Sequence, residues 1–102
     1  MRLKPGVKVA GIAPEMVLAA VIAQSILGDV ELVVTSALDG KHSVHSRHYQ
    51  GNAIDIRTRD LVPTARQEFR DKLADALGPD FDVVLESDHL HVELDPKTEA
   101  IA

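Results

Sequence analysis

The sequence predicts an α+β domain in which two helices pack on one small, mainly antiparallel sheet. Three observations predict this class. Two segments have the apolar pattern of a helix, and each begins at proline and ends at glycine. Short segments rich in Val, Ile and Leu lie between and after them, and glycine and polar residues separate these segments. A chain of 102 residues makes a single domain, in which we expect residues 1–13 to be an N-terminal extension and residues 95–102 a tail.

The first half of the chain predicts a helix, a strand and a long loop. The helix begins at Pro14, ends before Gly28 and has a broad apolar face. The residues expected on that face are Met16, Val17, Ala20, Val21, Gln24 and Leu27. Residues 30–35 are mostly β-branched and predict a strand that is largely buried on both faces. Residues 36–51 are polar without a period, which is typical of a long functional loop.

The second half predicts a strand, a helix and two adjacent strands. Residues 53–56 have strand character, and Pro63 begins a helix that runs to residue 77 and stops at Gly78. The residues expected on its inner face are Ala65, Phe69, Leu73, Ala76 and Leu77. Residues 81–85 and 89–94 are apolar-rich and flank a polar turn, so they are expected to be adjacent strands or one strand with a tight turn or bulge.

Composition excludes several classes of protein and site. The 11 Lys and Arg against 16 Asp and Glu give a net charge of -5, which argues against a surface that binds nucleic acid or anionic lipid. No cysteine is present, so any metal must be held by histidines and carboxylates. The longest apolar stretch, residues 16–23, is too short for a membrane span, and we identify no signal peptide. A substrate outside the cytoplasm would therefore be reached through cell lysis, a separate export device or a virus particle.

The five histidines predict a metal site because they fall in two short windows of the chain. They are His42, His45 and His48 in the long loop, and His89 and His91 near the C-terminus. Residues two apart on a strand share one face, so His89 and His91 point the same way. His48, Asp55 and one of these two histidines would make a three-ligand site with an open fourth position, which is typical of catalytic zinc.

These motifs resemble a known group of zinc peptidases. The pattern S-x-H-x-x-G-x-A-x-D over residues 46–55, followed by H-x-H over residues 89–91, is similar to the D-alanyl-D-alanine carboxypeptidase and L-alanyl-D-glutamate endopeptidase group. The same pattern occurs in the hedgehog signalling domain. The resemblance spans roughly residues 30–94 and implies the α+β zinc fold of both groups.

The resemblance implies a role for each site residue. His48, Asp55 and His91 would bind one zinc ion, and His89 would bind or polarise the scissile carbonyl. Glu86 is the preferred general base, because hedgehog-like sequences have a glutamate at the matching strand end. Those sequences have one more residue before H-x-H, however, and the carboxypeptidase pattern places its glutamate at the position of Asp88, so Asp88 remains the alternative.

The polar residues that remain are given smaller roles. Glu93 repeats the period of the two histidines and could face the site, but we interpret it as an outward-facing strand residue. His42 matches a histidine of the similar family close to the metal, so it would hold a ligand or substrate by a hydrogen bond or else be a plain loop histidine. Arg47, Arg57 and Arg59 could each contact a substrate carboxylate, although a solvated charge at a strand end is the preferred interpretation of each.

The function that the resemblance implies is hydrolysis of peptidoglycan stem peptides. The chain would then be a zinc metallopeptidase of bacteriophage or prophage origin that degrades the cell wall as an endolysin or a particle-borne enzyme. Its partner would be the peptidoglycan peptide, with no nucleic acid and no membrane. The alternative is a zinc-containing binding or structural module that does not cut, such as a component of a phage particle.

Overall fold

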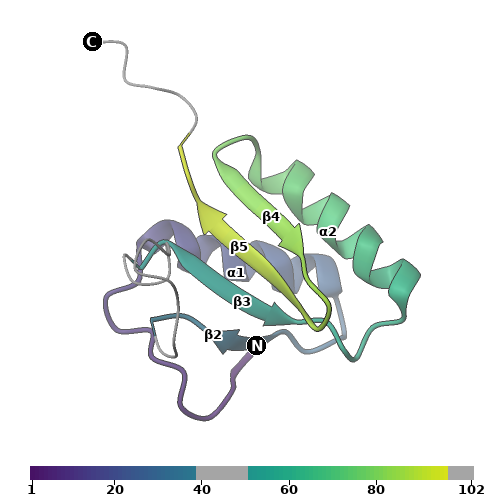
Figure 1. The fold of residues 1–102 in the computed structure, drawn as a ribbon, viewed down its shortest axis with the longest axis horizontal. Helices are drawn as coiled ribbons and strands as arrows, with labels where there is room; N and C mark the ends of the chain where they lie inside the picture. Colours follow the sequence, from purple (N-terminus) through teal and green to yellow (C-terminus); the bar gives the residue numbers. More distant parts are fainter. Residues whose placement is uncertain (39–50, 97–102) are drawn as a thin grey trace.

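The protein is described by a computed structural model that covers residues 1–38 and 51–96. The predicted α+β class is confirmed, because two helices pack on one mixed five-stranded sheet (Figure 1). In chain order the elements are β1 (Arg2–Leu3), α1 (Pro14–Leu27), β2 (Val33–Ser36), β3 (Ala53–Arg57), α2 (Pro63–Leu77), β4 (Phe81–Leu85) and β5 (His89–Leu94). The strand order is β1-β2-β3-β5-β4, with β1 parallel to β2 and the other neighbours antiparallel.

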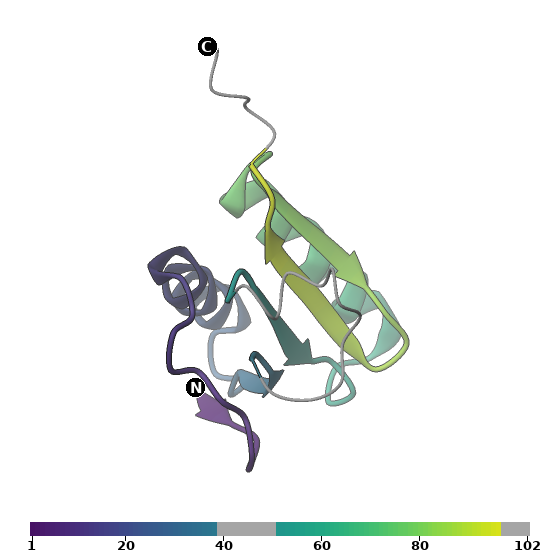
Figure 2. The same cartoon turned by 60° about the vertical axis from the view of Figure 1, so that its left-hand side comes forward.

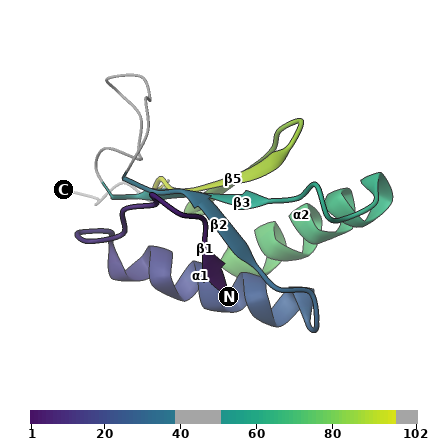
Figure 3. The ribbon, with the colours of Figure 1, turned by 90° about the horizontal axis from the view of Figure 1, so that it is seen from below.

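The sheet separates a core face from an open face. Both helices lie on the same side of the sheet (Figure 3). On β3 and β5, alternate residues point toward the helices and are fully or almost fully buried: Ile54, Ile56, Leu90 and Val92. Successive side chains of a strand point to opposite faces. Asp55, His89 and His91 therefore lie on the face that the helices do not cover.

Helix α1 has the predicted bounds but a different buried face. Pro14 occupies its first turn, and the backbone N–H of Gly28 closes its end on the carbonyl of Gln24. Met16 and Ala20 are buried as expected, but Val17 and Val21 are each 52% exposed. The fully buried positions include two alanines instead, Ala19 and Ala23, because small side chains allow this helix to lie close to α2 and β5.

Strand β2 begins at Val33 rather than at residue 30. The side chain of Gln24 explains the later start, since its amide nitrogen donates to the carbonyl of Val30 at 3.0 Å and its oxygen accepts from the backbone N–H of Leu32 at 2.8 Å. These backbone groups are therefore bound to the end of α1 instead of to a strand. The expected burial on both faces holds for Val33 and Val34 but not for the half-buried end of the strand. Most of the predicted loop, residues 39–50, lies outside the described residues.

The first residues of the chain join the sheet, although no sequence pattern predicts a strand there. Arg2 and Leu3 form β1 at the edge beside β2 (Figure 2). The backbone N–H of Arg2 donates to the carbonyl of Leu32 at 2.8 Å, and that of Lys4 donates to the carbonyl of Val34 at 2.9 Å. Part of the expected N-terminal extension is thus a strand of the sheet. At the other end, residues 97–102 of the expected tail lie outside the described residues.

Helix α2 covers β4 and contacts α1. It begins at Pro63 and ends at Leu77, as predicted, and it buries Phe69 and Leu73 against the sheet. Ala76, which was expected to face inward, is exposed. Across the described residues, neither helix is long and apolar enough to cross a membrane.

Candidate metal site

Two of the three predicted metal ligands face each other on the open side of the sheet. Asp55 on β3 is the direct cross-strand partner of His91 on β5. The Nδ1 atom of His91 lies 2.9 Å from Oδ1 of Asp55, and the two side chains are only 20% and 13% exposed. The third predicted ligand, His48, lies outside the described residues, as do His42 and Arg47.

The donor atoms of this pair suit zinc. Histidine nitrogen and carboxylate oxygen are zinc ligands, and two ligands that are each about 2.0–2.1 Å from a tetrahedral ion lie roughly 3.3 Å apart. The observed 2.9 Å between Nδ1 and Oδ1 is therefore close to what a shared ion needs. Asp55 and His91 fit as two zinc ligands that the sheet register holds together.

In the metal-free protein, His91 is held in its charged form. A carboxylate accepts hydrogen bonds only, so both ring nitrogens of His91 carry protons: Nδ1 donates to Asp55, and Nε2 donates to Glu93 at 2.7 Å. The bond to Asp55 is the main cause that raises the pKa of His91 from 6.5 to about 9. Burial opposes this shift, and the bond to Glu93 adds to it.

Glu93 belongs to the site, which corrects the interpretation that it faces outward as a plain strand residue. Its carboxylate accepts from Nε2 of His91, and its side chain is 22% exposed. Histidines that bind a metal through one nitrogen are commonly oriented by a carboxylate on the other. The signal was present in the sequence, because Glu93 follows His89 and His91 at the same two-residue spacing.

His89 extends the site toward the turn between β4 and β5. Its Nε2 lies 3.9 Å from Oδ2 of Asp55, and its Nδ1 donates to the carboxylate of Asp88 at 2.7 Å. This bond is also the main cause of the lowered pKa of Asp88. His89 therefore stands between two carboxylates, one on each side of its ring.

The two candidate general bases are placed differently. Asp88 lines a pocket with His89 and Asp55, although its side chain is 78% exposed. Glu86 is exposed and does not line that pocket, although its backbone N–H closes the turn on the carbonyl of His89 at 2.9 Å.

A polar pocket opens beside the predicted metal ligands. Its volume is about 210 Å³. It combines cationic, acidic and neutral polar side chains from three strands and three connecting segments: Lys4, Thr35, Asp55, Arg57, Arg59, Asp88 and His89. A ligand that reaches Asp55 and His89 from this side would therefore meet positive charge.

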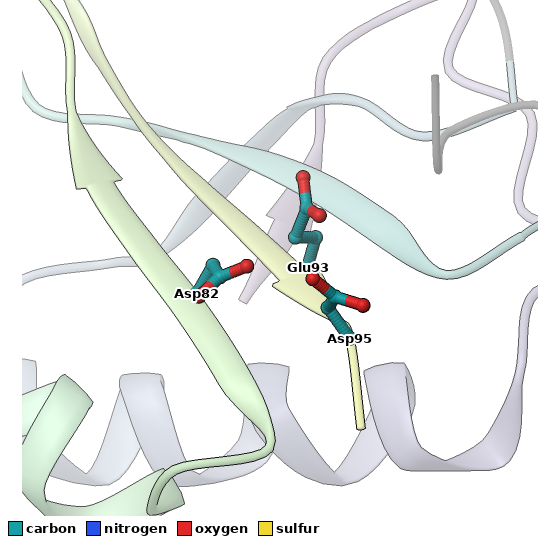
Figure 4. Close-up of side chains that lie close together, drawn as sticks. All are labelled: Asp82, Glu93 and Asp95. Atoms are coloured by element: carbon teal, nitrogen blue, oxygen red, sulfur yellow. The ribbon is translucent and has the colours of Figure 1, made fainter. Parts of the chain in front are cut away.

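An acidic group lies at the other end of the row formed by His89, His91 and Glu93. Asp82 on β4 is the cross-strand partner of Glu93, and Asp95 follows β5 (Figure 4). One carboxylate oxygen from each of these three residues lies within 4.8 Å of the others, so the group can hold a cation. Negative charge thus gathers at one end of the row and positive charge at the other.

Comparison with known proteins identifies the family. The search of curated proteins found no match. The family model of the hedgehog amino-terminal signalling domain matches residues 14–94, which include both helices, β2 to β5 and all of the predicted metal ligands. This family is structurally related to zinc peptidases. The chain therefore belongs to the hedgehog amino-terminal signalling domain family.

Proposed function

We propose that the protein is a zinc-dependent metallopeptidase that hydrolyses peptide bonds in the stem peptides of bacterial peptidoglycan. The bond would be of the D-alanyl-D-alanine carboxypeptidase type or the L-alanyl-D-glutamate endopeptidase type. The observation that carries this proposal is the pairing of Asp55 with His91, because their donor atoms lie 2.9 Å apart beside an open pocket. A purely structural metal site would be closed by protein ligands rather than bordered by a pocket.

The pairing and the sequence motifs support one set of zinc ligands. Asp55 and His91 would hold the ion together with His48 from the loop, as the sequence pattern implies. When bound, zinc supplies a Lewis acid that polarises the peptide carbonyl and lowers the pKa of water. The residues around it must then bind the peptide, stabilise charge on its carbonyl oxygen and move a proton.

His89 is suited to stabilise negative charge on that oxygen. In its protonated form, the ring would be flanked by the carboxylate of Asp88 at 2.7 Å and that of Asp55 at 3.9 Å. Its Nε2–H can then donate to the carbonyl oxygen as charge develops there, while Asp88 keeps the ring in place. In that form, His89 would be a positioned hydrogen-bond donor in a partly buried site.

Asp88 and Glu86 are the two groups proposed to accept the proton of the attacking water. The position of Asp88 in the pocket supports Asp88, since a general base must come within hydrogen-bond reach of the water. The similarity to hedgehog-like sequences supports Glu86. Both carboxylates lie at the turn between β4 and β5, so both assignments place the base at the same end of the site.

The direct test is mass spectrometry of fragments released from purified peptidoglycan by zinc-loaded protein. New peptide termini are expected, and they identify the bond that is cut. Glu86→Gln and Asp88→Asn are compared in parallel, and the general base is the residue whose amide variant binds zinc normally but releases no fragments. Intact peptidoglycan after treatment with protein that holds one zinc per chain would refute the peptidase.

The second proposed function is a zinc-containing binding or structural module that does not cut. It is favoured by the exposed position of Glu86 outside the pocket. In that case the wild type and both amide variants would bind zinc equally and leave peptidoglycan intact. Metal bound only to the native state would still raise thermal stability.

A further inference from the structure

The pocket beside the predicted metal ligands has cationic side chains that do not pair with the carboxylates of the same pocket. Asp55 is hydrogen bonded to His91, and Asp88 is hydrogen bonded to His89. The three cations are Lys4, Arg57 and Arg59. Within residues 1–38 and 51–96, none of these three side chains has a hydrogen bond or ion pair. A negatively charged group that enters the pocket would therefore find cations ready to pair with it.

The backbone fixes the places from which these cations reach the pocket. Arg57 follows Asp55 by two residues on β3, so both project from the same face, and its cross-strand partner is His89. Lys4 follows β1, and its backbone N–H is bonded to the carbonyl of Val34.

Arg59 lies in the turn after β3, which α2 holds in place. The guanidinium of Arg66 donates to the carbonyl of Thr58 at 3.0 Å and to that of Leu61 at 2.8 Å. It also reaches the carbonyl of Arg59 itself at 3.4 Å. The backbone on both sides of Arg59 is therefore fixed, while its own side chain remains available to a ligand.

We propose that this pocket binds the α-carboxylate of the residue that directly follows the scissile bond. The proposal rests on the proposed peptidase function and specifies its substrate. Residues two apart on a strand are separated by roughly 6.6 Å, and one extended residue spans about 3.3–3.6 Å. A carboxylate held near Arg57 is thus one or two residues away from a carbonyl placed at Asp55.

Both bond types named above supply this carboxylate. In a D-alanyl-D-alanine terminus it is the free C-terminus of the last residue. In an L-alanyl-D-glutamate bond it is the α-carboxylate of the glutamate, which stays free when the chain continues through the γ-carboxyl group. The guanidinium groups of Arg57 and Arg59 match a carboxylate with paired N–H donors, and the ammonium of Lys4 adds charge.

Binding is tested first on metal-free protein, so that zinc cannot itself be the partner of the carboxylate. N-acetyl-D-alanine is titrated into isotope-labelled protein and followed by NMR, with N-acetyl-D-alanine amide as the neutral probe. We expect the acid to shift the amide signals of Arg57, Arg59 and His89, and the amide to shift none of them. Equal binding of both probes would overturn the proposal.

Variants of the pocket make the test specific. Arg57→Gln combined with Arg59→Gln should weaken binding of the acid about tenfold, since hydrogen bonds to charged groups are lost. Arg57→Lys should restore part of it. The control is Lys72→Gln on the exposed face of α2, which removes a cation far from the pocket and should change nothing. Unchanged affinity in the double variant, with an intact amide spectrum, would refute the assignment.

Cleavage assays on zinc-loaded protein separate the two sources of the carboxylate and the two proposals. Peptides ending in D-alanyl-D-alanine are compared with their C-terminal amides, and peptides containing L-alanyl-D-glutamate with those that carry the α-amide. The carboxylate that the pocket binds comes from the type of peptide whose cleavage is abolished by amidation. Equal cleavage of acids and amides would refute the pocket assignment but keep the peptidase. Carboxylate binding that depends on the arginines without any cleavage would keep the pocket and refute the peptidase.

Discussion

Replacing Glu93 with alanine should lower the affinity of the protein for zinc by about 10- to 100-fold, because carboxylates that orient a metal-binding histidine have effects of this size. The reason lies in the 2.7 Å bond between Glu93 and Nε2 of His91. This bond turns the other ring nitrogen, Nδ1, toward Asp55. Without Glu93 the ring can rotate, so zinc binding must also fix its orientation, and this cost makes binding weaker.

The expected loss of zinc affinity is consistent with the usual strength of a hydrogen bond between charged groups. The range of 10- to 100-fold corresponds to about 1.4–2.7 kcal/mol. A hydrogen bond to a charged group contributes about 1.5–3 kcal/mol and a neutral one about 0.5–1.5 kcal/mol. Glu93→Gln keeps an acceptor for His91 but loses the charge, so it should cost about 1 kcal/mol, or roughly fivefold in affinity.

The assay is competition for zinc against a chelator of known affinity. Glu93 also helps raise the pKa of His91 to about 9, so its removal reduces competition by protons as well. Affinities are therefore measured from pH 6.5 to 9.5 and compared at the highest pH. Glu68→Gln is the control for Glu93→Gln, because it makes the same substitution on the exposed face of α2; it should leave zinc affinity unchanged. Zinc affinity within about twofold of wild type in Glu93→Ala would refute the role of Glu93.

Three further predictions concern stability. Leu90→Ala removes a fully buried side chain near the start of β5 and should cost about 2–5 kcal/mol in urea unfolding; a loss below about 1 kcal/mol would contradict its placement in the core. Gly51→Ala should destabilise the fold by at least about 1 kcal/mol more than Gly28→Ala, because both have positive φ but only at Gly51 would a Cβ meet backbone, 2.7 Å from the carbonyl oxygen of Gly11; equal thermal shifts would contradict this. In metal-free protein, protonated His91 stabilises the fold because its pKa is raised to about 9; this contribution is complete below pH 6.5 and is lost as the pH rises through about 9. If the free energy of unfolding had the same pH dependence in the wild type and in His91→Gln, this prediction would be refuted.

The helices could be predicted because their signals are local. Pro14 and Pro63 begin them, and Gly28 and Gly78 end them, as the structure has it. The strands next to the site were predicted for a similar reason, since apolar residues alternate with histidine on β5. The alternation alone does not show that His91 lies opposite Asp55, because that pairing depends on the register of β5 against β3.

The features that were missed depend on contacts between distant parts of the chain. Strand β1 has only two residues, and its parallel partner residues on β2 lie 31 positions later in the chain, so no local pattern predicts it. The late start of β2 depends on the side chain of Gln24 in the preceding helix. Glu93 has the right spacing for the site, but the spacing does not show whether its carboxylate binds His91 or points into solvent. That depends on the conformations of both side chains.

The division of β3 and β5 into a core face and a site face has a consequence for refolding. If β5 slipped by one residue against β3, His91 would turn into the core and Leu90 would turn into water. Core packing and the alignment of Asp55 with His91 therefore both require the same pairing of the two strands. Uptake of zinc during refolding would report how many molecules have paired these strands correctly, independently of how much sheet has formed.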